Sequence, residues 1–570
     1  MDRMCALCQT KFTITAEDLS FYEKISPVFG GKKYAIPPPT LCPDCRQQRR
    51  LAWRNDRTFY RRKCDLTGST FLSMYAPDAP FPVYRQDAWH SDKWDALQHG
   101  REIDWSRPFF PQWADLNNHV PHWGVAITNC ENSDFCNYCN DEKNCYLDIA
   151  AEANEDCYFN HFVKFSKNCV DCHFAYHSTL CYECIQCYNC YALRWSQYMD
   201  DCSDCAFCFD CKGSRNCLLS INLRNKQHCI LNEQHTKEEY ERKLAELHLG
   251  SWSALQKVFA LWKKIRIEKG IYRDMYNFNC EDCIGNDLKN SKNCRFSFNA
   301  LGSEDSAYLY DVLDAKNCYD MNYSPYGPEA SYEVTSTVGL KHSAFYMAGP
   351  YNVSCYYCHM LQSCTSCFGC IGLKHQKYCI LNKQYSKEEY EVLVPKFIEY
   401  MCKDGGGAMN PNTGSASGSW GEFFPVALSP HGYNETVAQE YFPLSKEAVL
   451  KRGWRWREEV EEERPSGPVA HIPDAIGDVT DDLCQKVLLC AASRKPYKII
   501  PQELKFYRQS GIPVPHRSPA QRHKDRNTLR NPRKLWSRKC AKCGKGIETT
   551  YSAERPEVVY CEECYLKAVY

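Results

Sequence analysis

A twelve-residue rhythm of cysteines organises the middle of the chain, from about residue 129 to residue 384. Most of these cysteines follow an Asn or an acidic residue and precede an aromatic or aliphatic one. The first four are Cys145, Cys157, Cys169 and Cys181. After an interruption the same spacing returns from Cys294 to Cys379. A short fixed period indicates one supersecondary unit repeated, each copy burying its apolar edge by stacking on the next.

Twelve residues are too few for a pair of helices but suit short strands joined by turns, as the β-branched, aromatic and turn-forming residues also indicate. We therefore predict a mainly β fold with added helices, whose centre is a parallel β-solenoid of twelve-residue Cys-rich repeats in two halves, or a wider β-helix that uses two repeats per rung. Residues in phase would lie roughly 4.8 Å apart on neighbouring strands, so the cysteines would form an internal column. Ser306, Ala330 and Ser343 fall in the same phase. They share the small volume of cysteine but cannot all replace a thiolate, which favours a narrow core over metal binding at these positions.

A second group of cysteines steps by three residues, a spacing for which strand packing offers no reason. A metal ion or an iron–sulfur cluster is one interpretation of this group, and packing is the other. The candidate ligands are Cys181, Cys184, Cys187, Cys190, Cys202, Cys205, Cys208 and Cys211.

Each half of the repeat ends in a helix-start signal. Thr236 with Glu239, and Ser386 with Glu389, have the spacing of a capping box. A helix there would cover the open edge of the last strand. The segment that begins "SWSALQKVFALWKK" continues as an amphipathic helix between the halves.

Two cysteine quartets predict structural zinc. Each consists of two CxxC pairs, whose four thiolates can close a tetrahedral site and hold together a module too small for a full core. In the first module Pro43 presets a helix that begins at the second pair. The ligands are Cys5, Cys8, Cys42 and Cys45 at one end, and Cys540, Cys543, Cys561 and Cys564 at the other.

The two ends of the chain repeat each other, with opposite modules intact. "RKCDLTGSTF" from Arg62 aligns with "RKCAKCGKGI" from Arg538, but Cys64 alone remains of that quartet. "CAASRKPYKIIPQELKFY" from Cys490 aligns with "CALCQTKFTITAEDLSFY" from Cys5, and its later cysteines are replaced by Ser518 and Gln521. We expect both degenerate copies to fold by packing, without an ion.

The first fifty residues resemble the zinc-ribbon (treble-clef-like) family, through the pattern C-x-x-C, an aromatic pair and C-P-x-C-R-x-x-R. The resemblance implies tandem treble-clef/zinc-ribbon modules at both termini. Nearly the whole chain resembles uncharacterised cysteine-rich zinc-ribbon proteins of uncultured bacteria with small genomes, in stretches such as "LCPDCRQQRRLAWRNDR" and "GYNETVAQEYFPL". Some members of that group carry an automatic label as family III CoA-transferases. No residue here supports that label, and the repeat architecture argues against it.

These patterns divide the chain into segments. They are a zinc-binding module (1–60), a degenerate zinc-ribbon module (61–95), a connecting segment (96–124), the first Cys-rich half (125–234), a helical insert (235–276), the second half (277–384), a capping helix (385–404), a flexible linker (405–421), a connecting segment (422–483), a degenerate zinc-binding module (484–535) and a zinc-ribbon module (536–570). The linker is inferred from its Gly and Ser content. An acidic run, "REEVEEERPSG", is expected to be a solvated face.

Composition narrows the setting. The 570 residues carry 70 basic and 70 acidic side chains, so no overall field directs the protein to nucleic acid or membrane. The 39 cysteines would suggest a disulfide scaffold in a small secreted protein, but the start has no apolar leader and the CxxC pairs favour reduced thiols and metal. We expect a cytoplasmic location and no membrane partner.

Local basic patches point to nucleic acid or a ribonucleoprotein as a partner. Residues 494–545 contain 16 Lys and Arg against two acids, and aromatic residues lie among them. Phosphate contact with base stacking needs that combination. The candidate contacts are Arg46, Arg49, Arg50, Arg54, Arg522, Arg526 and Arg530. The alternative is that these arginines pair with acids of the protein's own repeat.

Two other functions stay open. A protein-interaction scaffold would use the long flank of the repeat as its surface. An enzyme or a redox cluster protein would rest on the CxxC runs alone, because the chain has no P-loop, GxSxG, HExxH or dinucleotide-binding fingerprint. The 17 histidines do not gather at metal-ligand spacings.

Overall fold

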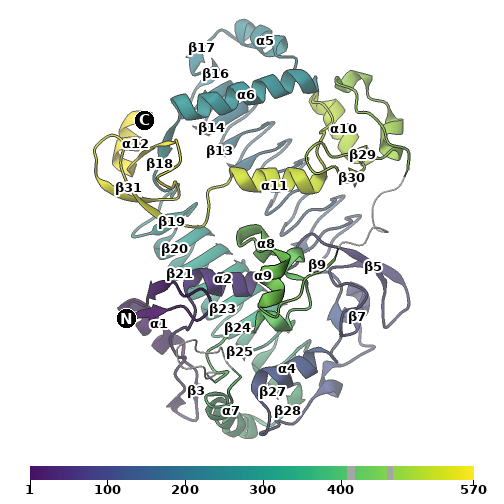
Figure 1. Ribbon diagram of the computed structural model, residues 1–570, viewed down its shortest axis with the longest axis vertical. Coiled ribbons are helices and arrows are strands. Elements are labelled where there is room, and N and C mark those ends of the chain that lie inside the picture. The colour runs from purple at the N-terminus through teal and green to yellow at the C-terminus, as the bar shows by residue number, and fades with distance from the viewer. Residues whose placement is uncertain (407–417, 459–466) are drawn as a thin grey trace. The chain divides into compact units, whose positions relative to one another are not determined.

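The computed structural model describes residues 1–406, 418–458 and 467–570. It divides into two compact units (Figure 1): unit 1 comprises Met1–Ala126 and Tyr276–Glu458, and unit 2 comprises Ile127–Met275 and Glu459–Tyr570. Each unit therefore combines one pair of terminal modules with one half of the repeat. Most of the predicted linker at 405–421 and of the acidic run lies outside the described residues.

Unit 1 contains a ten-stranded sheet in which consecutive strands are neighbours. Its strands are β19 (Ile284–Asn286), β20 (Lys292–Leu301), β21 (Glu304–Leu313), β22 (Lys316–Ser324), β23 (Glu329–Val338), β24 (Ala344–Pro350), β25 (Val353–Tyr356), β26 (Thr365–Phe368), β27 (Lys377–Ile380) and β28 (Lys383–Gln384). All pair in parallel except the last, and Cys355, Cys367 and Cys379 are direct partners twelve residues apart. The predicted phase is wrong at one position. Cys318 pairs with Ser331, not with Ala330, because the extra residue lies before β23 and not after it.

Unit 2 contains the matching seven-stranded sheet. Its strands are β11 (His173–Tyr176), β12 (Ile185–Tyr188), β13 (Gln197–Asp200), β14 (Ala206–Lys212), β15 (Arg215–Ile221), β16 (Gln227–Ile230) and β17 (Glu233–Gln234). Isolated parallel bridges such as Glu131↔Lys143 and Lys143↔Glu155 extend the twelve-residue register to the start of the repeat, beside β9 (Ile127–Thr128) and β10 (Cys139–Asn140). In both units the last strand turns back antiparallel.

A backbone period of three explains the cysteine spacing that strand packing alone did not. Nearly every third residue of the repeat has a left-handed conformation, as at Asn168, Asp171 and Phe174, whose φ angles are 51°, 56° and 54°. The residue after each of them points into the core, so Cys169 and Cys172 are both fully buried. Asn and Asp tolerate this conformation best among non-glycine residues, which is why they so often precede the cysteines.

The core side chains also satisfy the backbone around them. The thiol of Cys208 donates to the carbonyl oxygens of Ala206 (3.5 Å) and Cys217 (3.4 Å). The hydroxyl of Ser178 donates to the Tyr176 oxygen at 3.0 Å and accepts from the amide of Cys190 at 3.3 Å. Cysteine, serine and asparagine are therefore interchangeable here because each is small and can pair with a backbone group at the corner of a turn.

Helices cover the strands and form the modules. Both capping-box predictions are confirmed: Thr236 caps α5 (Lys237–Glu246) and Ser386 caps α7 (Lys387–Met401). The predicted helix between the halves is α6 (Trp252–Lys269). The others are α1 (Ala16–Ile25), α2 (Pro43–Leu51), α3 (Gln86–His90), α4 (Phe109–Asn117), α8 (Val437–Tyr441), α9 (Lys446–Lys451), α10 (Pro501–Ser510), α11 (Pro519–Leu529) and α12 (Glu562–Val569).

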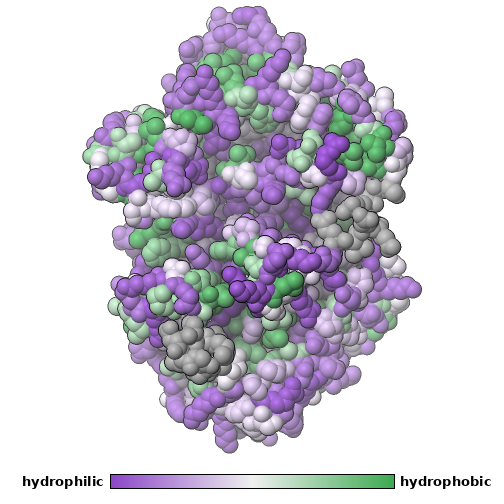
Figure 2. Space-filling view, viewed as in Figure 1, coloured by the Kyte–Doolittle hydropathy of each residue, from purple (hydrophilic) through white to green (hydrophobic). Residues whose placement is uncertain are grey.

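The remaining strands form two-stranded pairs in and around the modules. They are β1 (Asp2–Met4) with β2 (Lys11–Thr13), β3 (Val28–Phe29) with β4 (Lys32–Lys33), β5 (Tyr60–Lys63) with β6 (Thr70–Ser73), β7 (Val83–Tyr84) with β8 (His122–Trp123), β18 (Ile271–Arg273) with β33 (Val558–Tyr560), β29 (Leu488–Leu489) with β30 (Pro496–Tyr497), and β31 (Trp536–Lys539) with β32 (Gly546–Thr549). The face drawn in Figure 2 is mostly hydrophilic, with apolar patches among the polar side chains. No helix among the described residues is both long and apolar enough to cross a membrane.

Candidate metal centres and arginine clusters

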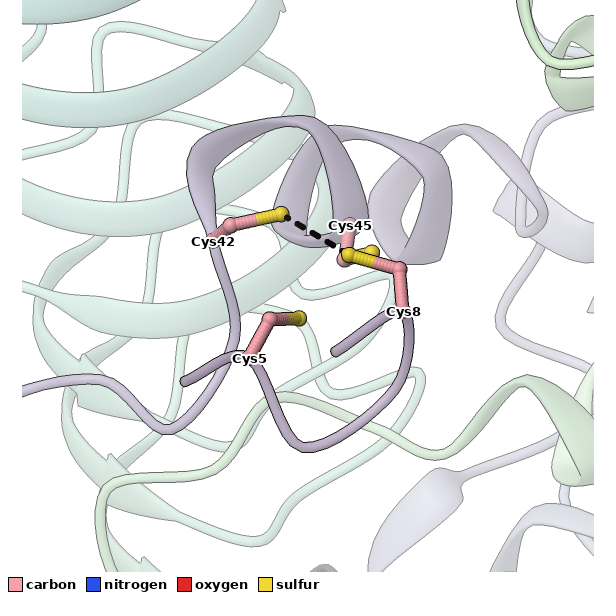
Figure 3. A group of neighbouring side chains, drawn as sticks. All are labelled: Cys5, Cys8, Cys42 and Cys45. Atoms are coloured by element: carbon pink, nitrogen blue, oxygen red, sulfur yellow. Dashed lines mark hydrogen bonds between the residues drawn. The ribbon is translucent and has the colours of Figure 1, made fainter. Parts of the chain in front are cut away.

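The first predicted quartet comes together in unit 1 (Figure 3). Cys5 and Cys8 lie in the turn after β1, where Gln9 has a φ of 60°, and Cys42 is the N-cap of α2. All four sulfurs, that of Cys45 included, lie within 4.8 Å of one another, and Cys8 and Cys42 are 3.7 Å apart. A tetrahedral ion with Zn–S bonds of about 2.3 Å separates its sulfurs by about 3.8 Å. The quartet can therefore hold a metal ion such as zinc.

The protonation pattern of this quartet fits metal loading. Hydrogen bonds from Cys42 and Cys45 lower the pKa of Cys5 far below that of a free thiol. Contact with Cys45 acts to lower the pKa of Cys42, but the bond to Cys5 and burial outweigh it and raise that pKa to about 12. One thiolate is thus stabilised by its neighbouring thiols, and an incoming cation would displace the remaining protons.

The second predicted quartet comes together in unit 2. Cys540 and Cys543 follow β31, Cys561 caps α12 and Cys564 lies in its first turn. The four sulfurs lie within 4.8 Å of one another, with Cys543 and Cys561 3.8 Å apart. Burial acts to raise the pKa of Cys540, but the amides of Cys543 and Cys561 outweigh it and lower that pKa to about 6. Both terminal clusters are compatible with zinc-ribbon sites.

The degenerate modules keep their shape by other contacts. The Cys64 sulfur accepts a hydrogen bond from the Arg85 amide at 3.3 Å, and β5 pairs with β6 as β31 pairs with β32. Ser518 takes the place of Cys42 as a helix N-cap, and its hydroxyl accepts from the Gln521 amide at 3.3 Å. A local hydrogen bond thus replaces an ion at the start of α11.

The eight cysteines that step by three do not converge on one point. They are at most 3% exposed, and each thiol pairs with a backbone carbonyl, as Cys184 does with Tyr182 at 3.4 Å. Among the described residues, no three of these sulfurs come within 4.8 Å of one another. The three-residue backbone period accounts for their spacing, so packing, the second of the two interpretations, explains it without a metal site. The residues are Cys181, Cys184, Cys187, Cys190, Cys202, Cys205, Cys208 and Cys211.

The arginines predicted to contact nucleic acid in unit 1 are buried, and this prediction is corrected. Arg46, Arg49, Arg50 and Arg54 are 1%, 8%, 0% and 1% exposed. Arg46 pairs with Asp320 at 2.9 Å. Arg50 pairs with Asp320 at 3.2 Å and with Glu333 at 2.8 Å. Guanidinium groups held in this way are not available to phosphate.

Electrostatics favours the charged forms of Arg46 and Glu333, whereas burial raises the pKa of Asp320. Burial acts to lower the pKa of Arg46, but the charge of Asp320 outweighs it and raises that pKa well above its usual value. Burial acts to raise the pKa of Glu333, whereas Arg50 and Arg49 outweigh it and lower that pKa. Arg49 also pairs with Glu422 at 2.7 Å, so α2 is fastened to both the repeat and the segment after it.

Unit 2 repeats the same arrangement around α11. Arg522 and Arg526 are 2% and 3% exposed and pair with Asp171 at 3.0 and 2.6 Å. Arg522 also pairs with Glu503 at 2.8 Å. The predicted contacts Arg522 and Arg526 are therefore corrected in the same way, whereas Arg530 is half-buried.

The two clusters match in register as well as in chemistry. Arg46 lies 5.1 Å over the ring of Tyr308, twelve residues before Asp320, and Arg522 lies 5.0 Å over Phe159, twelve before Asp171. Two further stacks, Arg54 on Tyr323 at 3.9 Å and Arg530 on Phe174 at 4.1 Å, involve rings three residues after the same acids. We call these matched sets the arginine clamps. Sequence reasoning missed their acidic partners, although the alignment of the two chain ends already placed the arginines in correspondence.

Comparisons with known proteins add little. No family model and no curated protein matches the chain. Among solved structures, one match is the "putative acetyltransferase from Desulfovibrio desulfuricans G20", 9% identical over 43% of this chain, with a TM-score of 0.10. The chain spans 64% of that structure's length, and a likeness of this size carries no argument.

Proposed function

We propose that this chain is a non-enzymatic, zinc-stabilised binding protein that holds single-stranded nucleic acid, RNA above all, through the C-terminal modules of unit 2. The observation that carries the proposal is the solvent exposure of the 16 Lys and Arg side chains between residues 494 and 545. Arg522 and Arg526 are buried, but eleven of the sixteen are exposed, and the only acids in this stretch are Glu503 and Asp525. The exposed cations are Arg494, Lys495, Lys498, Lys505, Arg508, Arg517, Lys524, Lys534, Lys539, Lys542 and Lys545.

The proposal assigns the rest of the molecule a supporting role. The parallel sheets in twelve-residue register are the faces of a β-solenoid, the zinc-ribbon modules attach to it, and the arginine clamps fix the attachment. The 39 cysteines all lie in the described ranges and none forms a disulfide, which supports a reducing, cytoplasmic setting. Zinc is the ion of choice because four thiolates in two CxxC pairs suit its tetrahedral preference.

Aromatic side chains beside the exposed lysines would stack on the bases, while the lysines contact the phosphates. Lys534 lies 5.5 Å from the ring of Trp536, and Lys542 lies 6.0 Å from that of Tyr560. Both rings are half-buried, so one part packs on the module and the other can reach a base. Stacking of this kind tolerates any base, which favours single strands without strong sequence preference.

The test is binding of a fluorescent single-stranded RNA, followed by anisotropy. The variant K539Q/K542Q/K545Q removes three exposed cations around the second quartet and none of its ligands. Each phosphate contact on a single strand contributes about 0.7 log units of affinity at 0.1 M salt, so the affinity should fall by roughly 100-fold. K292Q is the matched control, because Lys292 is an exposed lysine of the repeat that pairs with Glu281 at 2.9 Å. Equal affinities for the triple variant and the control would refute the proposal.

A protein-interaction scaffold is the second candidate, favoured by exposed stacked rings on the repeat. Phe165 is 45% exposed and stacks on His177 with centroids 5.0 Å apart and 8° between the planes. A partner protein would cover such a ladder of rings, since aromatic residues are enriched at interfaces. A protein that co-purifies with the wild-type chain and is lost from F165S, while RNA affinity stays unchanged, would favour this candidate.

A further inference from the structure

One turn of the repeat in unit 2 differs from the other described turns in the side chains that point into its core. Its four inward positions are Glu142, Cys145, Asp148 and Ala151, which follow the left-handed residues at 141, 144, 147 and 150. Across the rest of the described repeat, the buried inward positions hold thiol, hydroxyl, amide or apolar side chains. Among the described residues of the repeat, Glu142 and Asp148 are therefore the only carboxyl groups at buried inward positions.

The two carboxyl groups and the thiol face one another. Glu142, Cys145 and Asp148 are 1%, 2% and 0% exposed, and one ligand atom of each lies within 4.8 Å of the other two. The side-chain amide of Asn154 donates to Asp148 at 3.1 Å and its backbone amide to Glu142 Oε1 at 3.4 Å. Oε2 of Glu142 is buried with no hydrogen-bond partner. A buried carboxylate oxygen in this state is costly unless a proton or a cation compensates it.

We propose that Glu142, Cys145 and Asp148 bind a divalent transition-metal ion of the zinc class inside the repeat. Zinc accepts both thiolate sulfur at about 2.3 Å and carboxylate oxygen at about 2.0–2.2 Å, and its tetrahedral geometry separates the ligand atoms by roughly 3.3–3.8 Å. The three groups need to close only slightly to reach that geometry. Cys136, one turn earlier in the same column as Asp148, is the thiol placed to complete the set.

A surface pocket lies beside the turn that carries the cluster. A surface pocket of about 250 Å³ in unit 2 includes Cys145 in its lining, together with Asp134, Asn144 and Lys505. The site shares no ligand with the terminal quartets, so it does not depend on the proposed function.

Metal stoichiometry of the full-length protein tests the proposal. After equilibration with Zn²⁺ and removal of free ion, the wild type should carry three ions per chain, and E142Q/D148N should carry two. E155Q is the control, because Glu155 is an outward-facing acid of the next turn that pairs with Lys167 at 2.9 Å, and it should keep all three. Equal zinc content in E142Q/D148N and the wild type would overturn the proposal. Replacing Cys543 and Cys564 by serine removes a terminal ion separately, so failure of a quartet is distinguishable from failure of this site.

A positional measurement covers the case in which E142Q/D148N does not fold. Anomalous diffraction from wild-type crystals at the zinc absorption edge should show a peak bounded by the Glu142, Cys145 and Asp148 side chains. A map with peaks at the terminal quartets and none at this turn would overturn the proposal, and would mean that the two carboxyl groups are protonated.

Discussion

Loss of one acid from an arginine clamp should release its helix. In unit 1, Asp320 accepts from Arg46 Nε at 2.9 Å and from Arg50 Nη1 at 3.2 Å, and the three side chains are at most 2% exposed. Asp320→Asn keeps the shape and removes the charge that two buried guanidinium groups share. Removing one partner of a buried ion pair costs about 3–5 kcal/mol. We expect the lower end, about 3 kcal/mol, because Arg50 keeps Glu333 at 2.8 Å and Arg46 keeps the Leu41 oxygen at 2.8 Å.

Hydrogen exchange of the α2 amides measures this loss locally, which matters because a chain of two units need not unfold in one step. A loss of 3 kcal/mol corresponds to roughly 150-fold faster exchange, at 1.36 kcal/mol per decade. Glu304→Gln is the control, since its pair with Lys316 is 3.5 Å long, about half exposed, and worth about 0–1 kcal/mol. Asp171→Asn should act on α11 in the same way. Protection of α2 in D320N within a few-fold of that in E304Q would refute the clamp.

Three further predictions follow from the core and the quartets. Cys208→Ser should change the free energy of unfolding by less than about 1 kcal/mol, since the hydroxyl can donate to the same carbonyls, whereas Cys208→Leu should cost about 1–3 kcal/mol by overpacking; equal urea midpoints for the two variants would contradict this. Burial lowers the pKa of His359 to about 4 and that of His431 to about 3. Both folded values lie below the unfolded value of about 6.5, so each neutral imidazole contributes stability that is fully present above pH 6.5 and is lost as the pH falls towards 4. For His359 alone the free energy of unfolding should fall by about 3 kcal/mol over this range. A urea midpoint of H359F as pH-dependent as that of the wild type would count against this prediction. A chelator should deprotect the amides of α12 and leave α11 protected, because Ser518 and not an ion caps α11; equal deprotection of both helices would be inconsistent with this account.

The sequence was most informative where chemistry is local. A CxxC pair is one turn of backbone, so both quartets could be predicted from spacing alone, and so could the capping boxes at Thr236 and Ser386. The twelve-residue period also predicted the parallel register, because residues in phase pair on neighbouring strands. Its phase failed at Ala330, because a single inserted residue has no marker of its position when several small residues are adjacent.

Two features could not be predicted from the sequence: the left-handed backbone conformation, which most residues disfavour, and the arginine clamps, whose partners are distant in the sequence. The left-handed positions include aromatic residues such as Phe174 and Tyr308, for which conformational propensity alone would not predict a positive φ. The clamp of unit 1 joins Arg46 to Asp320, which lie 274 positions apart in the sequence. A run of arginines reads the same whether phosphate or a carboxylate of the same chain neutralises it, so the basic patch of unit 1 gave no sign that it was internal.

The salt dependence of RNA affinity tests the central claim most directly. If exposed lysines of the C-terminal modules engage about six phosphates, the log–log slope of affinity against salt should be near −4 for a single strand. K539Q/K542Q/K545Q should reduce its magnitude by about 2, and K292Q should leave it unchanged. A slope near zero for the wild type, or a slope that the triple variant does not alter, would contradict nucleic-acid binding by these modules.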